Sequence, residues 1–174
     1  VGGPVISFEL AQRQQTEIAF CGKDKSVLEK LKAMLETDYY HISLTDDIAG
    51  LECAVAMKNA YALGVSLAIG LNEKAGNEKE KYNPQAALFE EGTREAMKLM
   101  QFMHGRIEET LPFFAGDLYV TVFGGRTRRI GTLLGSGKTY VEAREILAGV
   151  TLESVAIATL VAKVIRNGKL NEKD

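Results

Sequence analysis

The stretch IAGLECAVAMKNAYALGVSLAIGL, residues 48–71, decides the fold of this 174-residue chain. It is almost wholly apolar, and as a helix it would be long enough to span a bilayer. Glu52, Lys58 and Asn59 lie near its middle and argue against a membrane span, because each is expensive in hydrocarbon. We therefore expect residues 48–71 to form the buried central helix of a soluble domain.

The residues before this stretch predict a short α/β segment. Strand-like runs at 16–21 and 41–45 flank a helix that Ser26 could cap. At helical spacing, the expected apolar face of that helix is Val27, Leu28, Leu31, Met34 and Leu35. An order of helix, strand, helix and strand is typical of the end of a parallel α/β sheet. The segment covers residues 1–45.

Residues 46–174 predict helices only, so the fold class is mainly α. Pro84 starts a long helix that reaches about Met103. Its expected core residues are Ala87, Leu88, Met97, Leu99 and Met100. A last apolar helix opens at Thr151 or Ser154 and stops at Asn167-Gly168. The opening residues 1–6 read as the middle of a fold, so we expect a piece of a longer protein.

Composition excludes several classes of function. Lys and Arg total 21 against 23 for Asp and Glu, a net charge of −2 that attracts neither nucleic acid nor anionic lipid. Cys21 and Cys53 fit free thiols in a reducing compartment, hence a cytoplasmic protein. His41 and His104 lack the partners for a Cys/His cage, so no metal site is expected.

Lys58 is the most informative single residue. Desolvating an ammonium costs several kcal/mol unless it is paired, and burial brings a lysine pKa toward the range of general acid/base catalysis. Glu52, Asn59 and Ser66 follow one another at steps of seven and predict a polar stripe beside it. The alternative is a lysine that snorkels to the helix surface, and the residues alone favour neither.

A second constellation is GDLYVT at 116–121, followed by FGGRTRR at 123–129. Asp117 and Thr121 are four apart and share a helix face. Arginines in the first turn of the next helix oppose its dipole unless they bind an anion, and an arginine fork suits phosphate. The alternative is a solvated basic turn paired to Glu108, Glu109 or Glu142.

The run GSGKT at 135–139 resembles the end of a phosphate-binding P-loop. That motif needs a glycine where Thr132 stands and a preceding strand, so a helix terminator is the better interpretation. The chain also lacks the G-x-G-x-x-G motif that cradles a dinucleotide pyrophosphate.

Taken together, these segments resemble the NAD(P)-dependent glycerol-3-phosphate dehydrogenase family. The similarity lies in GLE at 50–52 with AMKN at 56–59, in Asn83 to Gly92, and in GDL, Thr121 and GGR at 124–126. Gly3-Pro4 with Glu9 resembles the segment that enters the last strands of the family's Rossmann domain. The resemblance implies an all-helical C-terminal domain of the 6-phosphogluconate-dehydrogenase-like type, preceded by an α/β remnant of the nucleotide-binding domain.

The resemblance also implies roles for individual residues. Lys58 matches the lysine that exchanges a proton with the substrate C2 oxygen, and Asp117 matches a carboxylate that holds it. The implied substrate contacts are Gly3, Asn59, Thr121, Arg126 and Thr127, and the implied contacts to NAD or NADP are Ser7 and Arg126.

The implied reaction interconverts sn-glycerol 3-phosphate and dihydroxyacetone phosphate. An upstream Rossmann domain is the expected partner, so the fragment alone is expected to be inactive. The apolar residues 48–71 leave a homodimer open.

Departures from the family pattern keep two alternatives in view. Thr127 replaces a usual Asn, Val5 a hydroxyl residue, Glu91 a frequent Arg, and Ala148 a Glu or Gln. One alternative is a dehydrogenase of another phosphorylated or acidic hydroxy substrate. The other is a non-catalytic helical oligomerisation or binding module.

Overall fold

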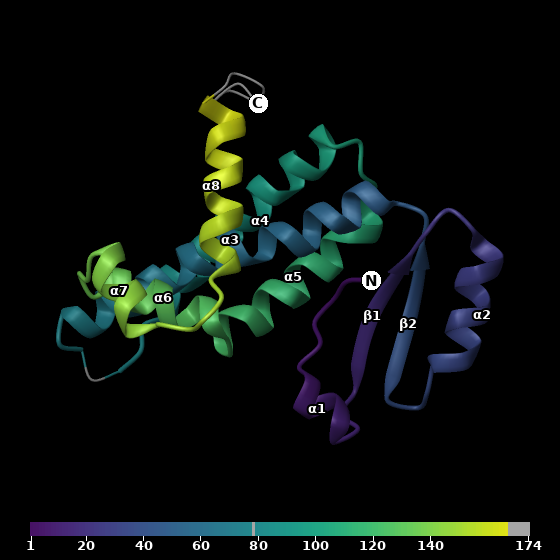
Figure 1. Ribbon diagram of the computed structural model, residues 1–174, viewed down its shortest axis with the longest axis horizontal. Coiled ribbons are helices and arrows are strands. Elements are labelled where there is room, and N and C mark those ends of the chain that lie inside the picture. The colour runs from purple at the N-terminus through teal and green to yellow at the C-terminus, as the bar shows by residue number, and fades with distance from the viewer. Residues whose placement is uncertain (78, 167–174) are drawn as a thin grey trace. The chain divides into compact units, whose positions relative to one another are not determined.

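The computed structural model describes residues 1–77 and 79–166, and over these it is mainly helical with one small parallel sheet (Figure 1). This is the expected fold class. The chain divides into two compact units. Unit 1 comprises Val1–Lys58 and Glu95–Val120, and unit 2 comprises Asn59–Arg94 and the chain from Thr121 onward.

Unit 1 contains the sheet. Strands β1 (Thr16–Cys21) and β2 (Tyr40–Thr45) pair in parallel, with Ile18 opposite Ile42. Helix α1 (Ser7–Ala11) precedes β1, and helix α2 (Lys25–Leu35) connects the strands. Both strands lie where the apolar runs predicted them, because alternate side chains of each strand are buried against α2.

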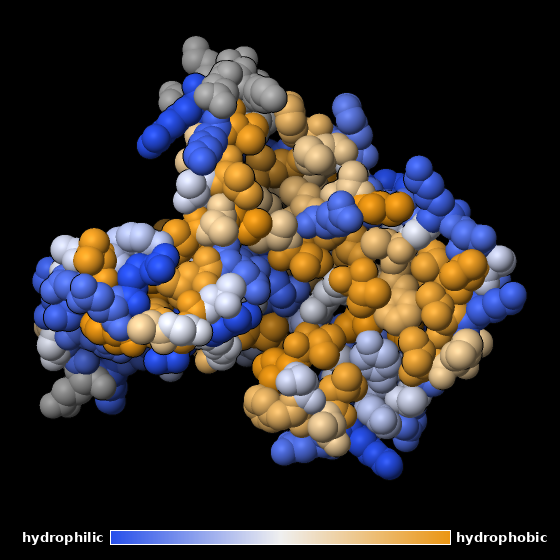
Figure 2. Space-filling view, in the orientation of Figure 1, coloured by the Kyte–Doolittle hydropathy of each residue, from blue (hydrophilic) through white to orange (hydrophobic). Residues whose placement is uncertain are grey.

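Helix α2 differs from expectation in its cap and its apolar face. Asp24, not Ser26, caps the helix, and its side chain accepts hydrogen bonds from the amides of Ser26 and Val27. Of the expected apolar face only Leu28 is buried, whereas Val27, Leu31, Met34 and Leu35 are exposed. Figure 2 shows apolar side chains at the surface over the strands and α2. Two strands and one helix bury too little to cover that face.

Helix α3 (Ile48–Lys74) is the expected core helix and is three residues longer than its apolar stretch. By length and composition it is the one helix among the described residues that could cross a membrane. However, its apolar side chains serve the cores of both units. Leu51, Ala54 and Met57 are buried in unit 1, and Ala62, Val65 and Ile69 are buried in unit 2.

Helix α4 (Tyr82–Phe102) begins two residues before Pro84. Its core was only partly predicted, since Met100 is buried and Met97 and Leu99 are half-buried, while Ala87 and Leu88 are exposed. Helix α5 (Ile107–Phe123) follows and contributes the buried Phe114 and Leu118 to unit 1. Pro112 lies inside this helix, in its N-terminal half, and the helix continues past it.

Unit 2 packs helix α6 (Arg126–Gly135) against the second part of α3 through glycines. A Cβ on Gly70 would lie 2.0 Å from the Thr132 carbonyl oxygen, and one on Gly135 would lie 2.2 Å from that of Leu67. A Cβ on Gly131 would lie 2.4 Å from the Ser66 Cβ. The two backbones approach so closely that no larger residue fits at these positions.

The GSGKT run ends α6 and starts helix α7 (Tyr140–Ile146), so the terminator interpretation is confirmed. Gly137 has a φ of 98°, and Thr139 forms a capping box with Glu142 at the start of α7. Helix α8 (Glu153–Arg166) closes the described chain. The expected helix stop at Asn167-Gly168 lies outside the described residues.

Candidate active site

Lys58 and Asp117 form an ion pair inside unit 1. The Lys58 Nζ lies 2.6 Å from the Asp117 Oδ1, and the two side chains are 20% and 3% exposed. Helix α3 carries the lysine and helix α5 the aspartate, and the buried residues Met57 and Leu118 flank the pair along the chain. Of the two interpretations left open by the sequence, the structure favours a desolvated and paired ammonium.

Burial dominates the electrostatics of this pair. It raises the pKa of the Asp117 carboxyl above its usual value, while the hydrogen bond and the charge of Lys58 act in the opposite direction. The Asp117 carboxylate is therefore a group whose charge depends on the neighbouring ammonium. An ammonium held in this way can exchange a proton with a bound hydroxyl, and its partner keeps the nitrogen oriented.

Two of the expected site residues follow directly along the same helices. Asn59 comes after Lys58 on α3, and Thr121 lies one turn beyond Asp117 on α5. Both are half-buried and both belong to unit 2. Each unit thus holds part of the expected set.

The start of α6, where an anion site is expected, lies in unit 2. Arg126 is exposed and forms a surface ion pair with Glu153 on α8, with an N–O distance of 3.3 Å. Thr127, the next residue, is buried. Two of the three acids named for a solvated basic turn are engaged elsewhere, since Glu109 pairs with Arg106 and Glu142 closes the capping box.

Arg128 is bound more firmly than Arg126. It donates to the Val122 carbonyl at 3.2 Å, at the end of α5, and pairs with Glu80 at 3.1 Å. Glu80 also accepts a hydrogen bond from the buried Gln85 at the start of α4. Sequence reasoning missed this cluster, because Glu80 stands in a polar loop 48 residues before its partner.

The expected polar stripe on α3 is wrong for Ser66. That side chain is fully buried, and its hydroxyl donates to the Ala62 carbonyl at 2.7 Å beneath Gly131. Glu52 is exposed and Asn59 half-buried, so the three residues share a spacing but not an environment. Ser66 packs between helices of unit 2, and a spacing of seven residues does not predict that burial.

The opening segment holds the remaining expected residues, Gly3 and Ser7, in unit 1. Gly3 has a φ of 135°, and a Cβ there would lie 3.0 Å from the Ile18 Cα, so its backbone packs directly on β1. Ser7 is exposed in the first turn of α1. The described residues contain no group of three or more His, Cys, Asp or Glu side chains that could hold a metal ion.

For a dinucleotide, the residues that the structure describes offer single contacts but no cradle. The exposed guanidinium of Arg126 suits a phosphate oxygen, and the exposed Ser7 hydroxyl can donate one hydrogen bond. These residues fit a dinucleotide that is held mainly by other parts of a protein.

Comparisons with known proteins agree on one family. The family described as "NAD-dependent glycerol-3-phosphate dehydrogenase C-terminus" matches residues 47–173. An NADP(+)-dependent glycerol-3-phosphate dehydrogenase of Archaeoglobus fulgidus is 31% identical over 148 residues, which cover 84% of this chain and 44% of that protein. An NAD(P)+ glycerol-3-phosphate dehydrogenase of Mycobacterium bovis is 31% identical over 98% of this chain and 49% of its own length.

A solved structure supports the same assignment. The crystal structure of glycerol-3-phosphate dehydrogenase from Coxiella burnetii superposes with a TM-score of 0.83 at 25% identity, over 98% of this chain and 51% of that one. The chain spans about half the length of the curated relatives it matches. With a family match over most of its length and a closely similar fold, this chain belongs to the NAD-dependent glycerol-3-phosphate dehydrogenase family, as its C-terminal portion.

Proposed function

We propose that this chain is the substrate-binding portion, with the catalytic lysine, of an enzyme that interconverts sn-glycerol 3-phosphate and dihydroxyacetone phosphate. The observation that carries the proposal is the buried Lys58–Asp117 ion pair in a chain of this family. A lysine at the surface is solvated by water and does not require a buried carboxylate as its partner. An ammonium held at 2.6 Å from one has a fixed direction from which to meet a substrate oxygen.

Lys58 exchanges a proton with the C2 oxygen of the substrate. In the oxidation direction the C2 hydroxyl gives up its proton as the C2 carbon becomes a carbonyl, and in reduction the lysine returns a proton to the same oxygen. A nicotinamide dinucleotide, NAD or NADP, supplies the hydride acceptor or donor when bound. Such positioned proton transfer contributes about 10²–10⁴ in rate.

Asp117 keeps that ammonium in place, and polar neighbours orient the substrate. Asn59 and Thr121 adjoin the pair along α3 and α5, and they supply an amide and a hydroxyl for the glycerol oxygens. Gly3 offers its backbone to the same substrate, where a side chain would clash with β1.

Arg126 and Thr127 bind the phosphate at the start of α6. The arginine's pair with Glu153 is half-exposed on both sides and therefore weak, so a dianionic phosphate displaces the carboxylate. Backbone amides of the first helical turn add favourable dipoles for the same anion. Ser7 and Arg126 contact the dinucleotide at its edge.

A nucleotide-binding domain is the partner that this chain requires. We infer that residues 1–45 are the end of that domain and that residues 46–174 are the helical substrate domain, in line with a family match that begins at residue 47. The exposed apolar residues of α2 support a covering partner. By this proposal the 174-residue chain alone turns over no substrate.

Location and assembly complete the proposal. The unbridged thiols of Cys21 and Cys53 support a cytoplasmic location. The exposed Leu71 near the end of α3 supports a homodimer, which sedimentation equilibrium of the complete enzyme would test.

The test of the proposed function is Lys58→Ala in the complete enzyme. We expect kcat to fall about 10²–10⁴-fold while circular dichroism shows a retained fold. The matched control is Lys25→Ala, which removes an exposed ion pair with Glu29 on α2 and should leave kcat unchanged. A Lys58→Ala enzyme with the parental kcat would overturn the proposal.

Phosphate recognition has its own test by calorimetry. Arg126→Ala should weaken binding of sn-glycerol 3-phosphate and leave the weak binding of glycerol as it is, because only the former carries the phosphate. An equal loss of binding affinity for both ligands would show that Arg126 has a role other than binding the phosphate.

A further inference from the structure

The N-terminal ends of α3 and α5 are joined by a single carboxylate in unit 1. Asp47, only 7% exposed, immediately precedes α3, and its Oδ1 accepts the amide hydrogen of Gly50 at 2.9 Å. Its Oδ2 accepts the backbone N–H of Arg106, the residue just before α5. One side chain thus caps the first helix and holds the start of the second.

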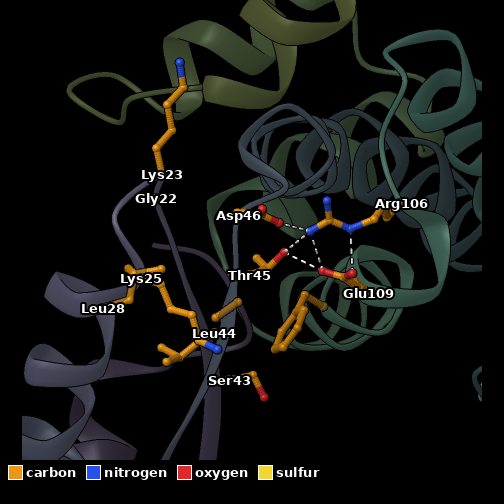
Figure 3. Close-up of a pocket in the computed structure, with 12 residues that line it drawn as sticks. Gly22, Lys23, Lys25, Leu28, Ser43, Leu44, Thr45, Asp46, Arg106 and Glu109 are labelled. Atoms are coloured by element: carbon orange, nitrogen blue, oxygen red, sulfur yellow. Dashed lines mark hydrogen bonds and ion pairs between the residues drawn. The ribbon is translucent and has the colours of Figure 1, made fainter.

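The Arg106 side chain connects the starts of α3 and α5 to the end of β2 (Figure 3). Its guanidinium donates to Thr45 and Glu109 and pairs with Asp46. Thr45 in turn donates to Glu109 at 2.6 Å and accepts from the Asp47 amide at 3.0 Å. The Arg106 and Thr45 hydrogen bonds lower the pKa of the Glu109 carboxyl, so this acid stays charged. We call these five residues, Thr45, Asp46, Asp47, Arg106 and Glu109, the N-terminal clamp.

Two glycines allow the backbones to meet at the clamp. A Cβ on Gly105 would lie 2.8 Å from the Gly50 Cα and 3.3 Å from the Asp47 Oδ2. A Cβ on Gly50 would lie 2.1 Å from that same oxygen. The chain entering α5 therefore rests directly on the first turn of α3. A side chain at position 105 would force the two apart, and one at position 50 would displace the Asp47 carboxylate that joins them.

The number of residues between the clamp and the ion pair is the same on both helices. Lys58 follows Asp47 by 11 residues, and Asp117 follows Arg106 by 11 residues. Eleven residues are about three turns and about 16 Å of helix, so each pair of positions lies on one helix face. Over Ile48–Lys58 and Ile107–Val120 the two helices run in the same direction from the clamp (Figure 1). Residues that lie between the clamp and the pair, Leu51 and Ala54 on α3 and Thr110 and Phe114 on α5, are fully buried.

We propose that Asp47 and Arg106 are positioning residues, whose contact sets the register of α3 against α5 and so holds the Lys58 ammonium against the Asp117 carboxylate. Because packed helices behave as rigid bodies, a shift at the clamp is carried three turns along to the pair. The consequence for turnover rests on the proposed function, whereas the consequence for the ion pair does not.

Asp47→Asn in the complete enzyme separates positioning from simple capping. Asparagine caps helices as well as aspartate does, so the bond to the Gly50 amide survives. Its second polar atom is an NH₂ group, which cannot accept from the Arg106 N–H. The matched control is Asp24→Asn at the cap of α2, where one oxygen accepts both amide hydrogens.

We expect Asp47→Asn to lower kcat about 10–100-fold with KM within about threefold, the cost of misplacing a catalytic group by about 1 Å. In a Lys58→Ala background the same substitution should cost nothing further, because Asp47 acts through Lys58. Carbon-13 NMR should show the Asp117 carboxyl titrating at higher pH than in the parent, since Lys58 is the charged group that faces it. Asp24→Asn should change none of these readouts.

Gly105→Ala is a second variant that acts by sterics instead of hydrogen bonding, and it should reproduce the same pattern. Measurements are made below each variant's unfolding temperature. Parental kcat and Asp117 titration in both clamp variants would overturn the positioning proposal. A fully active Lys58→Ala enzyme would instead overturn the proposed function, and the Asp117 titration would still report on the clamp.

Discussion

Replacing Lys58 by methionine removes the charge that Asp117 faces while keeping most of the side-chain volume. The Asp117 side chain is 3% exposed, so the variant must either keep a buried carboxylate without the Lys58 charge beside it or protonate that carboxylate. Breaking a buried pair from one side typically costs about 3–5 kcal/mol. Because the Lys58 side chain is 20% exposed, water reaches part of the site and we expect the lower end, about 3 kcal/mol.

The pH dependence of that loss provides the internal check. Burial already raises the pKa of Asp117, and losing Lys58 removes the influence that lowers it. The pKa of an unfolded aspartate is about 3.9, and a carboxyl whose pKa in the folded protein is higher destabilises the fold at pH values where it is charged. This loss of folding free energy becomes smaller as the pH falls and the carboxyl becomes protonated. The stability gap between parent and variant should therefore be widest near pH 7 and should shrink as the pH falls toward 4.

The assay is thermal unfolding followed by circular dichroism at pH 7, 6, 5 and 4. A loss of about 3 kcal/mol in a chain of this length lowers Tm by about 6–12 °C. The double variant Lys58→Met with Asp117→Asn should recover most of the loss at pH 7, because no buried charge remains. An equal Tm for parent and single variant at pH 7, or a gap that does not change with pH, would refute the reasoning.

Three further expectations concern other parts of the chain. Gly70→Ala should lower the free energy of unfolding of unit 2 in urea by more than about 1 kcal/mol, because the new Cβ meets the α6 backbone. Gly64→Ala, with open space around it, should stabilise α3 by up to about 1 kcal/mol. Similar effects of the two substitutions would contradict the packing of α3 against α6. Glu153→Gln should lower KM for sn-glycerol 3-phosphate about two- to fivefold in steady-state assays by releasing Arg126, and an unchanged or higher KM would exclude this competition. Burial raises the pKa of the Cys53 thiol, so mass spectrometry should find it alkylated more slowly at pH 8.5 than in the unfolded chain, and equal rates would show an open site.

Local signals in the sequence were sufficient for most of the fold. The run 16–21 matches β1 residue for residue, because a compact apolar segment ended by Gly22 has few alternatives to a strand. The apolar stretch from Ile48 gave the core helix with its correct start. The exposed face of α2 could not be foreseen, because the same helical spacing describes a face buried in this chain and a face that needs another partner.

The sequence names the candidate residues, whereas most of the contacts around them appear only in the structure. Lys58 was conspicuous because a charge in an apolar stretch demands an explanation, whereas Asp117 was tied to it only through the family resemblance. The clamp around Arg106 joins residues about 60 positions apart, and no periodicity or motif connects them. Pairings of this kind are set by tertiary packing, which the pattern of a single sequence does not encode.

Chemical rescue of the Lys58→Ala enzyme addresses the proton-transfer role most directly. Small primary amines added to the assay should restore part of kcat, in proportion to amine concentration and more strongly for amines of higher basicity, because they replace the missing ammonium at the C2 oxygen. Restoration that follows amine basicity is the result we expect. A variant that amines leave inactive while it still binds sn-glycerol 3-phosphate, or one that needs no amine at all, would contradict the role given to Lys58.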